Sequence, residues 1–280
     1  MHKLTNKFFK NLKKKLNDVK IKLIIKQIKA IQKKSKNKFV IYSYLTNNYD
    51  FIIKQKVKLK GVDFIFLSDN YINSHSWNLI KFDFIYRDPR RTAKIFKILP
   101  HIFFSSYKYS LCIDSNILLK NKIFSLIQSF KKSKTLVSMF EHSKRNCIYE
   151  EAKECKFWGM DDPKVIENQV KRYKKLKYPK DNGLMQCRLI LRKHNNTSVK
   201  SLMEFWWSEI DKHSVRDQIS FNFVSWKKRM NYEKIASFKS NNYIQVMSHK
   251  SYKNYSKKFS LMLKFKYLIQ KIYLIFKKLT

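Results

Sequence analysis

The sequence predicts an α/β fold, and two observations support this prediction. Short apolar runs alternate with helical stretches between residues 38 and 249, as expected when strands and helices follow one another along a chain. The 280 residues are 44% hydrophobic and 15% aromatic, which is enough to fill a core and excludes a fully disordered chain. The chain has only three glycines, which excludes a glycine-rich phosphate loop. Bound phosphates must therefore be neutralised by side chains or by a metal.

The individual elements follow from the apolar pattern and the helix-start signals. Buried strands are expected at residues 38–45, 62–68, 109–114, 135–140 and 185–191. Helices are expected at 121–132, 163–177, 199–212 and 217–230. The second of these helices has a clear beginning, because Asp162 can cap it and Pro163 suits its first turn.

Both ends of the chain carry most of the excess positive charge. Residues 1–39 hold 14 lysines and one acid, and residues 250–280 hold nine lysines and no acid, in a chain of net charge +41. Apolar residues recur at helical spacing near the start, at Leu4, Phe8, Leu12, Leu16, Val19 and Leu23. We therefore expect three parts: a basic amphipathic helical arm at 1–37, one domain at 38–249 and a basic amphipathic C-terminal helix at 250–280.

The charge favours partners that carry phosphates, and the two basic arms suit an anionic membrane surface. Two alternatives remain: the arms pack on the domain with their lysines in solvent, or the lysine excess only reflects an AT-rich gene. Lysines interrupt every apolar run before residue 38, and the four cysteines lack a metal-finger or paired spacing. We expect a cytoplasmic protein with reduced thiols, held by its arms at the inner face of the membrane.

Asp114 is the first candidate for chemistry, because it directly follows the buried run that begins at Tyr109. Ligands of open α/β sheets bind beyond the carboxyl ends of the strands. An acid there can hold a divalent cation, Mn²⁺ or Mg²⁺, that in turn binds a diphosphate. The second position of this D-x-N element is Asn116, whose uncharged amide can bind a cation or a ribose only weakly. Metal binding at this strand end therefore needs a further ligand.

A second cluster follows the expected strand at 135–140. His142 and Arg145 can face a phosphate or sugar hydroxyls, and Tyr149 with Glu150 and Glu151 can hydrogen-bond a polyol. A solvated helix start has the same composition, so both interpretations remain open.

Two further groups of residues complete the set of candidates. Asp217, followed by Gln218, lies among apolar residues, where an acid can act as a base or bind a sugar hydroxyl; alternatively it is paired with Arg216 at a helix start. Cations that suit a diphosphate precede the strand that ends at Asp114, namely Arg90, Arg91, Lys97 and His101.

The order and the residues of these blocks resemble those of a known family. The matching blocks are Arg90 to Lys97, Pro100-His101, Tyr109 to Ser115, Glu141 to Arg145, Tyr149-Glu-Glu151 and Arg216 to Phe221. Together they resemble the glycosyltransferase-like domain of the plant mucilage and turgor-related proteins, which also occurs in bacterial surface-polysaccharide gene clusters. The resemblance covers roughly residues 40–230. It implies a GT-A type nucleotide-diphospho-sugar transferase fold with a single mixed sheet flanked by helices. It also implies a shared site containing Asp114, His142, Arg145, Tyr149, Glu150, Arg216, Asp217 and Gln218.

A looser similarity points to the glycogenin-like retaining transferases. These enzymes place an Asp-Gln pair near the sugar and a late histidine on the metal. Asp217-Gln218 is similar to the first feature, and His249 is similar to the second. The resemblance thus implies Asp114 and His249 as metal ligands, although a histidine in such a position is more often an ordinary surface residue.

We therefore expect a glycosyltransferase that moves a sugar from a nucleotide-diphospho-sugar to a cell-surface glycan or a lipid-linked acceptor, as in capsule, lipopolysaccharide or exopolysaccharide synthesis. One alternative is a hydrolase of a lipid or glycan linkage with Glu150 or Asp217 as base. Another is a basic nucleic-acid-binding protein, which is disfavoured because the charge lies in the arms and no nucleic-acid-binding motif is present.

Overall fold

A seven-stranded mixed sheet forms the centre of the computed structural model, which describes residues 18–50, 52–70, 76–83, 85–86, 88–235 and 242–247. The strand order is β3-β2-β1-β4-β7-β6-β8. Only β7 runs antiparallel to its neighbours in this sheet. The strands are β1 (Phe39–Leu45), β2 (Val62–Ser68), β3 (Asn78–Lys81), β4 (Tyr109–Ile113), β6 (Val137–Glu141), β7 (Met185–Arg192) and β8 (Glu233–Ile235).

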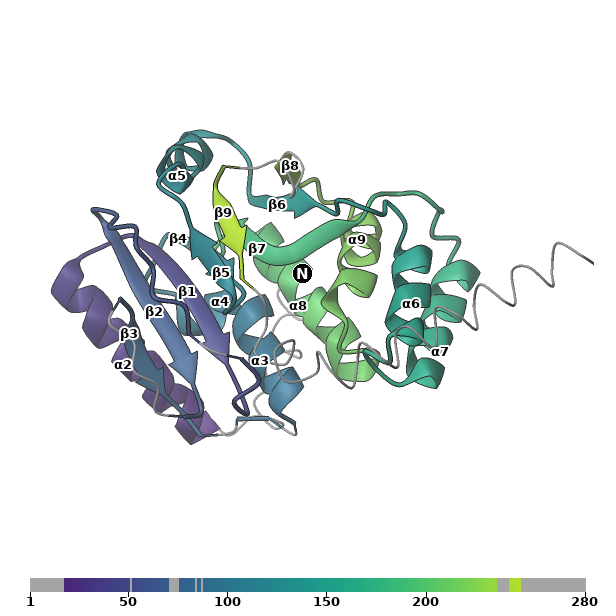
Figure 1. Ribbon diagram of the computed structural model, residues 1–280, viewed down its shortest axis with the longest axis horizontal. Coiled ribbons are helices and arrows are strands. Elements are labelled where there is room, and N and C mark those ends of the chain that lie inside the picture. The colour runs from purple at the N-terminus through teal and green to yellow at the C-terminus, as the bar shows by residue number, and fades with distance from the viewer. Residues whose placement is uncertain are drawn as a thin grey trace, which may run out of the picture.

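Helices cover both faces of the sheet (Figure 1). One face carries α2 (Asp18–Ser35), α3 (Pro89–Ile98), α4 (Pro100–Phe103), α6 (Ile148–Phe157), α7 (Pro163–Lys175), α8 (Thr197–Lys212) and α9 (Asp217–Lys228). The other face carries α5 (Ile123–Lys132) and a small antiparallel sheet of β5 (Ile117–Leu119) and β9 (Ile244–Val246). This arrangement confirms the predicted α/β class with a mixed central sheet.

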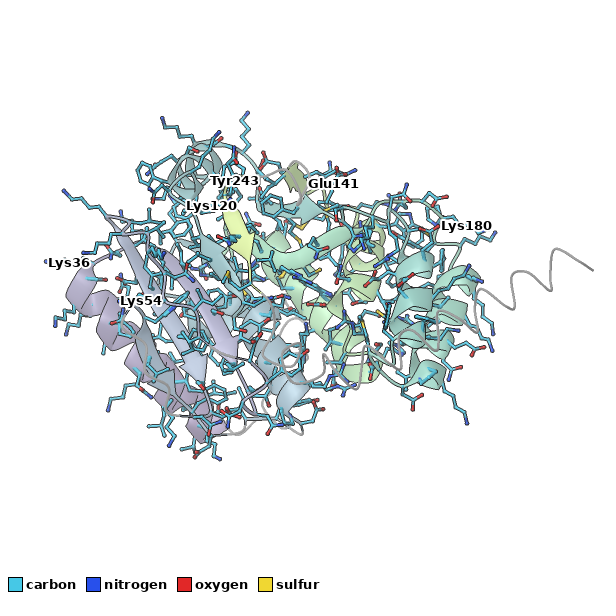
Figure 2. The ribbon with its side chains drawn as sticks, viewed as in Figure 1. Lys36, Lys54, Lys120, Glu141, Lys180 and Tyr243 are labelled. Atoms are coloured by element: carbon cyan, nitrogen blue, oxygen red, sulfur yellow. The ribbon has the colours of Figure 1, made fainter. Side chains whose placement is uncertain are left out.

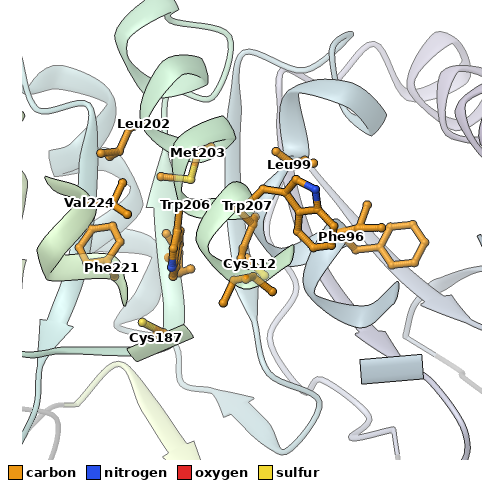
Figure 3. Packing of buried hydrophobic residues seen from close by; sticks show 14 of the residues in the cluster. Phe96, Leu99, Cys112, Cys187, Leu202, Met203, Trp206, Trp207, Phe221 and Val224 are labelled. Carbon is orange, nitrogen blue, oxygen red and sulfur yellow. The ribbon is translucent and has the colours of Figure 1, made fainter. Parts of the chain in front are cut away.

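The alternation of side chains along the strands creates two separate cores. In β1, Val40 and Tyr42 point into the larger helical layer, whereas Phe39 and Ile41 point towards α5. The larger core is filled by Trp206 and Trp207 of α8 together with residues of α3, α9 and the strands, as Figure 3 shows. Because all seven residues of β1 are buried, this strand lies in the centre of the molecule.

The predicted strands agree with the structure to within two residues at each end. The helix expected at 163–177 begins at Pro163, and the Asp162 side chain caps it by accepting hydrogen bonds from the amides of Lys164 and Val165. The helices α3, α4 and α6 were not among the predicted helices.

The first arm differs from its prediction. Its second half is α2, which packs on the body of the protein beside β2 and β3 (Figure 1). The buried face consists of Ile21, Ile24 and Ile28, while Val19 and Leu23 of the predicted apolar stripe are exposed. The domain therefore includes α2 and does not begin at residue 38. The earlier positions of that stripe and the segment 250–280 lie outside the described residues.

Exposed lysines lie around the periphery of the molecule. Figure 2 shows Lys36 and Lys54 at one end and Lys180 at the other. Exposed lysines of the described residues thus occur at both ends of the molecule in this view. Within this part of the chain, no helix combines the length and the apolar character that crossing a membrane requires.

Candidate active site

Two carboxylates meet at the carboxyl end of β4. Asp114 directly follows this strand, and Asp217 begins α9. Both accept a charged hydrogen bond from Lys97 of α3: its Nζ lies 3.0 Å from Asp114 Oδ1 and 2.7 Å from Asp217 Oδ2. A second lysine of the same helix, Lys94, places its Nζ 2.6 Å from Asp217 Oδ2. The structure thus joins residues of three elements into one network of alternating charge.

Helix α3 positions both Lys94 and Lys97 next to the carboxylates. It begins at Pro89 after Asp88, whose side chain accepts a hydrogen bond from the Arg91 amide and so caps the first turn. Residues three apart on a helix lie on the same face, so Lys94 and Lys97 point the same way. Only 2% of the Lys97 side chain is exposed, compared with 19% for Lys94. Lys97 is therefore an internal cation, and Lys94 is the one closer to solvent.

Burial and charge set the protonation of these groups. Burial alone would raise the pKa of Asp217, but Lys94 and Lys97 outweigh it and hold this pKa well below its usual range. The position of Asp217 at a helix N-terminus also stabilises a negative charge. Burial would lower the pKa of Lys97, but Asp114 and Asp217 raise it above its ordinary value. For Lys94, burial dominates, and its pKa is lowered.

A tyrosine and two cysteines surround this network. The Tyr44 hydroxyl of β1 donates to Asp114 Oδ1 at 3.3 Å. Cys112 and Cys187, two buried cysteines that Figure 3 labels, interact electrostatically with Lys97. Burial raises the pKa of Cys112 to about 11, so its thiol is neutral at physiological pH. Asp114 keeps 27% of its side chain exposed, and it is the acid of the network that a ligand can reach.

A second charged cluster is centred on Glu151 of α6. Its carboxylate accepts hydrogen bonds from Arg145, with Glu151 Oε2 at 2.7 Å from Nη2 and 3.0 Å from Nε. His142 uses Nδ1 to accept hydrogen bonds from the amides of Lys144 and Arg145, so it shapes the loop before α6. Burial lowers the pKa of His142, although the nearby Glu151 opposes this shift. The histidine is therefore largely neutral near pH 7.

Arg216 connects the two clusters. Burial would lower its pKa, but Cys155, Asp217 and Glu151 around it raise the pKa above its usual value. The guanidinium therefore lies between the carboxylate of the first cluster and that of the second. The resemblance implied one shared site for Asp114, His142, Arg145, Arg216 and Asp217, and the structure brings these five residues into one connected region.

A cleft of about 380 Å³ adjoins this region. Its lining includes the second cluster, Trp158 and Met160 after α6, and Gln186 and Arg188 of β7. The cleft borders the end of β4, because the Asp114 amide donates to the Arg188 carbonyl oxygen at 2.9 Å. A further hollow of about 460 Å³ continues past Lys144 and Arg145 to Glu150, which is exposed at its edge. Both hollows offer positively charged and polar groups to a ligand.

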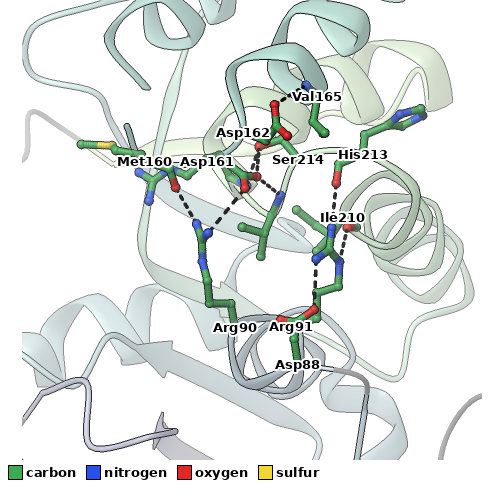
Figure 4. A network of polar contacts seen from close by, with 12 residues as sticks. Asp88, Arg90, Arg91, Met160, Asp161, Asp162, Val165, Ile210, His213 and Ser214 are labelled. Atoms are coloured by element: carbon green, nitrogen blue, oxygen red, sulfur yellow. Dashed lines mark hydrogen bonds and ion pairs between the residues drawn. The ribbon is translucent and has the colours of Figure 1, made fainter. Parts of the chain in front are cut away.

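Several predicted substrate-binding residues instead connect parts of the fold (Figure 4). Arg90 contacts the Met160 carbonyl oxygen and lies 3.4 Å from the Asp161 carboxylate. Arg91 donates to the carbonyl oxygens of Ile210 and His213 and to its own cap, Asp88. These contacts join α3 to α8 and to the loop before α7. Both guanidinium groups are engaged in contacts within the fold, which does not fit the predicted contact of Arg90 and Arg91 with a diphosphate.

His101 and Tyr149 lie inside the protein. His101 Nε2 lies 3.6 Å from Glu204 Oε1 of α8, and burial lowers the pKa of this histidine. Tyr149 is buried, and its hydroxyl donates to the Tyr178 carbonyl oxygen at 2.7 Å. Both side chains therefore stabilise the interior, which contradicts their predicted contact with a substrate.

The roles expected of Asp217 and Gln218 also change. Asp217 is buried and binds two ammonium groups, so it is too weak a base to deprotonate a hydroxyl. Its carboxylate is instead suited to hold the ammonium groups of Lys94 and Lys97 in position. Gln218 is partly exposed, and its backbone N–H donates to Asp217 Oδ1 at 3.1 Å.

The described residues do not fit the expected divalent cation. Asn116 uses its Nδ2 to donate to the Met247 carbonyl oxygen at 2.9 Å, which ties β5 to the end of β9. Asp114 Oδ1 faces the Lys97 ammonium group. Within the described ranges there is no group of three or more His, Cys, Asp or Glu side chains able to hold a metal. His249, the other predicted ligand, lies outside these ranges.

Sequence reasoning missed two contributors to this region, namely Tyr44 and Arg188, whereas Lys94 and Glu151 lie within blocks that it named. The three-residue spacing of Lys94 and Lys97 also indicates that both lie on one side of a helix. Tyr44 and Arg188 carried no such signal, since their positions depend on which strands flank β4.

Comparisons with known proteins give the family. Over 150 residues the chain is 32% identical to the probable hexosyltransferase MUCI70 of Arabidopsis thaliana, a match that spans 50% of this chain and 25% of that protein. Similar solved structures include mouse xyloside xylosyltransferase 1 (TM-score 0.43, 11% identity, 70% of this chain and 84% of that chain). Another is the bifunctional glycosyltransferase WbbM (TM-score 0.44, 14% identity, 72% and 38%).

The family model for the TOD1/MUCI70 glycosyltransferase-like domain matches residues 20–252, which include α2 and the whole described sheet. This match confirms the family expected from the residue blocks: the chain belongs to the TOD1/MUCI70 glycosyltransferase-like family.

Proposed function

We propose that the protein transfers a sugar, in the manner of a hexosyltransferase, from a nucleotide-diphospho-sugar to a glycan or a lipid-linked acceptor. The observation that carries this proposal is the network of Asp114, Lys97 and Asp217 at the carboxyl end of β4, inside the glycosyltransferase-like domain. This is the edge of an α/β sheet where ligands bind. The adjoining cleft offers Lys144, Arg145 and Arg188 for phosphates.

In the proposed reaction, the bond between the anomeric carbon and the diphosphate oxygen breaks, and the acceptor hydroxyl oxygen bonds to that carbon. The hydroxyl proton passes to the departing diphosphate or to water. Negative charge therefore grows on the diphosphate, and fixed cations around it stabilise the transition state. Asp114 accepts hydrogen bonds from hydroxyl groups of the donor and thereby orients it.

The cellular setting is part of the same proposal. The family resemblance favours an acceptor in surface-polysaccharide synthesis, and the lysine-rich ends would hold the enzyme at the cytoplasmic face of an anionic membrane. The exposed Val19 and Leu23 on α2, beside the exposed Lys22 and Lys26, support a contact between this helix and lipid headgroups.

The test is a transfer assay with the full chain, a panel of nucleotide sugars and a panel of glycan and lipid-linked acceptors. We expect release of nucleoside diphosphate that depends on one donor and one acceptor, and its loss in Asp114→Ala. Asp83→Ala is the matched control, because Asp83 is an exposed acid that pairs with Lys20 and lines neither hollow. Equal turnover by wild type and Asp114→Ala would contradict the proposal, and release of free sugar without any acceptor would indicate a hydrolase.

A further inference from the structure

The protein itself supplies the positive charge around Asp114. Asp114 and Asp217 bring two negative charges, and Lys94, Lys97 and Arg216 bring three positive charges. Lys97 lies between the two carboxylates, where it contacts both of them. The place that a bridging cation would take between these acids is thus filled by an ammonium group.

One oxygen of each carboxylate is also engaged in contacts with the protein. Calcium takes six to eight oxygen ligands and magnesium six, and carboxylates usually supply the charge. Asp114 Oδ1 accepts from Lys97 and Tyr44, and Asp217 Oδ2 accepts from both lysines. A divalent cation near these oxygens would meet ammonium groups at short range, and like charges repel most strongly in a buried site.

We propose that this site neutralises the diphosphate of a nucleotide sugar with its own lysine and arginine side chains and requires no divalent cation. The inference rests on the proposed function and names the source of the positive charge. Lys97 holds both carboxylates in place from inside the protein. Lys94, which is more exposed, reaches the diphosphate together with Lys144, Arg145 and Arg188 of the adjoining cleft. Asp114 accepts hydrogen bonds from donor hydroxyls in place of binding a metal.

The experiment measures the binding of UDP and GDP to the full chain by calorimetry, once with excess EDTA and once with Mn²⁺. We expect one of these diphosphates to bind with dissociation constants that agree within about threefold under the two conditions. Lys94→Gln should weaken that binding about tenfold in EDTA. The control is Lys171→Gln on α7, an exposed lysine paired with Glu167, and it should bind as wild type does.

Other outcomes separate this inference from the proposed function. Binding that is at least about tenfold tighter with Mn²⁺, and that loses this difference in Asp114→Asn, would overturn the metal-free site while the transferase proposal stands. Unchanged binding by Lys94→Gln in EDTA would also overturn it. If neither diphosphate binds under either condition, both the proposed function and this inference are contradicted.

Discussion

Lys97 and Asp217 form an internal ion pair, with 2.7 Å between Nζ and Oδ2, and each side chain is almost completely buried. The pair connects α3 to α9, and the same ammonium group reaches Asp114 at the end of β4. A buried charge without its partner is very unfavourable, so these three residues have to be positioned together. The site is therefore built partly from residues of the core.

Removing Lys97 tests this connection. We expect Lys97→Met to lower the free energy of unfolding by about 3–5 kcal/mol, because two acids lose a buried cation that they share. Urea unfolding followed by circular dichroism measures the change. Lys171→Met, which removes an exposed lysine, should change the stability by less than about 1 kcal/mol. Equal stability of wild type and Lys97→Met would show that the lysine is not needed to balance the two acids.

Arg91→Ala distinguishes a structural role from a role in binding. Arg91 donates to two backbone carbonyl oxygens near the end of α8 and to Asp88. Its removal should cost about 1–3 kcal/mol of folding stability. We expect no change in the affinity for UDP or GDP, measured by calorimetry on the same variant. A weaker affinity at unchanged stability would instead support the direct phosphate contact suggested by the sequence.

Asn116→Asp restores the second carboxylate of a D-x-D element. The side-chain amide of Asn116 donates to the Met247 carbonyl oxygen, and a carboxylate cannot do so. We expect a loss of about 1–3 kcal/mol in stability and no gain in Mn²⁺-dependent nucleotide binding. Asn121→Asp, at an exposed position before α5, is the control and should be neutral. Mn²⁺-dependent binding that appears only in Asn116→Asp would show that the strand end can accept a metal.

Stability should also depend on pH through His194. This residue is fully buried, with Nε2 2.9 Å from the Phe104 carbonyl oxygen, and burial lowers its pKa to about 3. The unfolded chain, with a histidine pKa of about 6.5, binds the proton first as the pH falls. The stabilising effect of the buried, neutral His194 is complete above about pH 6.5 and is lost as the pH falls from there towards 3.

We expect the free energy of unfolding to fall by about 1.4 kcal/mol per pH unit from this residue within that window. Urea unfolding at a series of pH values measures the slope. His194→Gln should have a shallower slope by that amount, and identical slopes for the two proteins would contradict the assignment. The pKa of His101 is also lowered by burial, so part of the slope should remain in the variant.

The sequence predicted most of the sheet, because β1, β2, β4, β6 and β7 are apolar runs that are buried along nearly their whole length. It did not predict that α2 packs on the sheet with Ile21, Ile24 and Ile28. In a helix with many apolar positions, two stripes are possible, and only the surface of β2 and β3 selects one of them.

The site was predicted in part. Asp114 was found because it ends a buried strand, and Asp217 because it begins a helix among apolar residues. The role of Lys97 as an internal bridge was not predicted, because a lysine in so basic a chain gives no signal of burial. The structural roles of Arg91, His101 and Tyr149 depend on the carbonyl and carboxylate groups that the fold brings to them.

The most direct test of the account is a crystal structure of the full chain with the diphosphate that binds, UDP or GDP. The account predicts that the diphosphate lies within hydrogen-bond distance of Lys94 and that a ribose hydroxyl donates to Asp114. A diphosphate bound on another surface, with Asp114, Lys94 and Lys97 unchanged and in contact only with one another, would contradict the account.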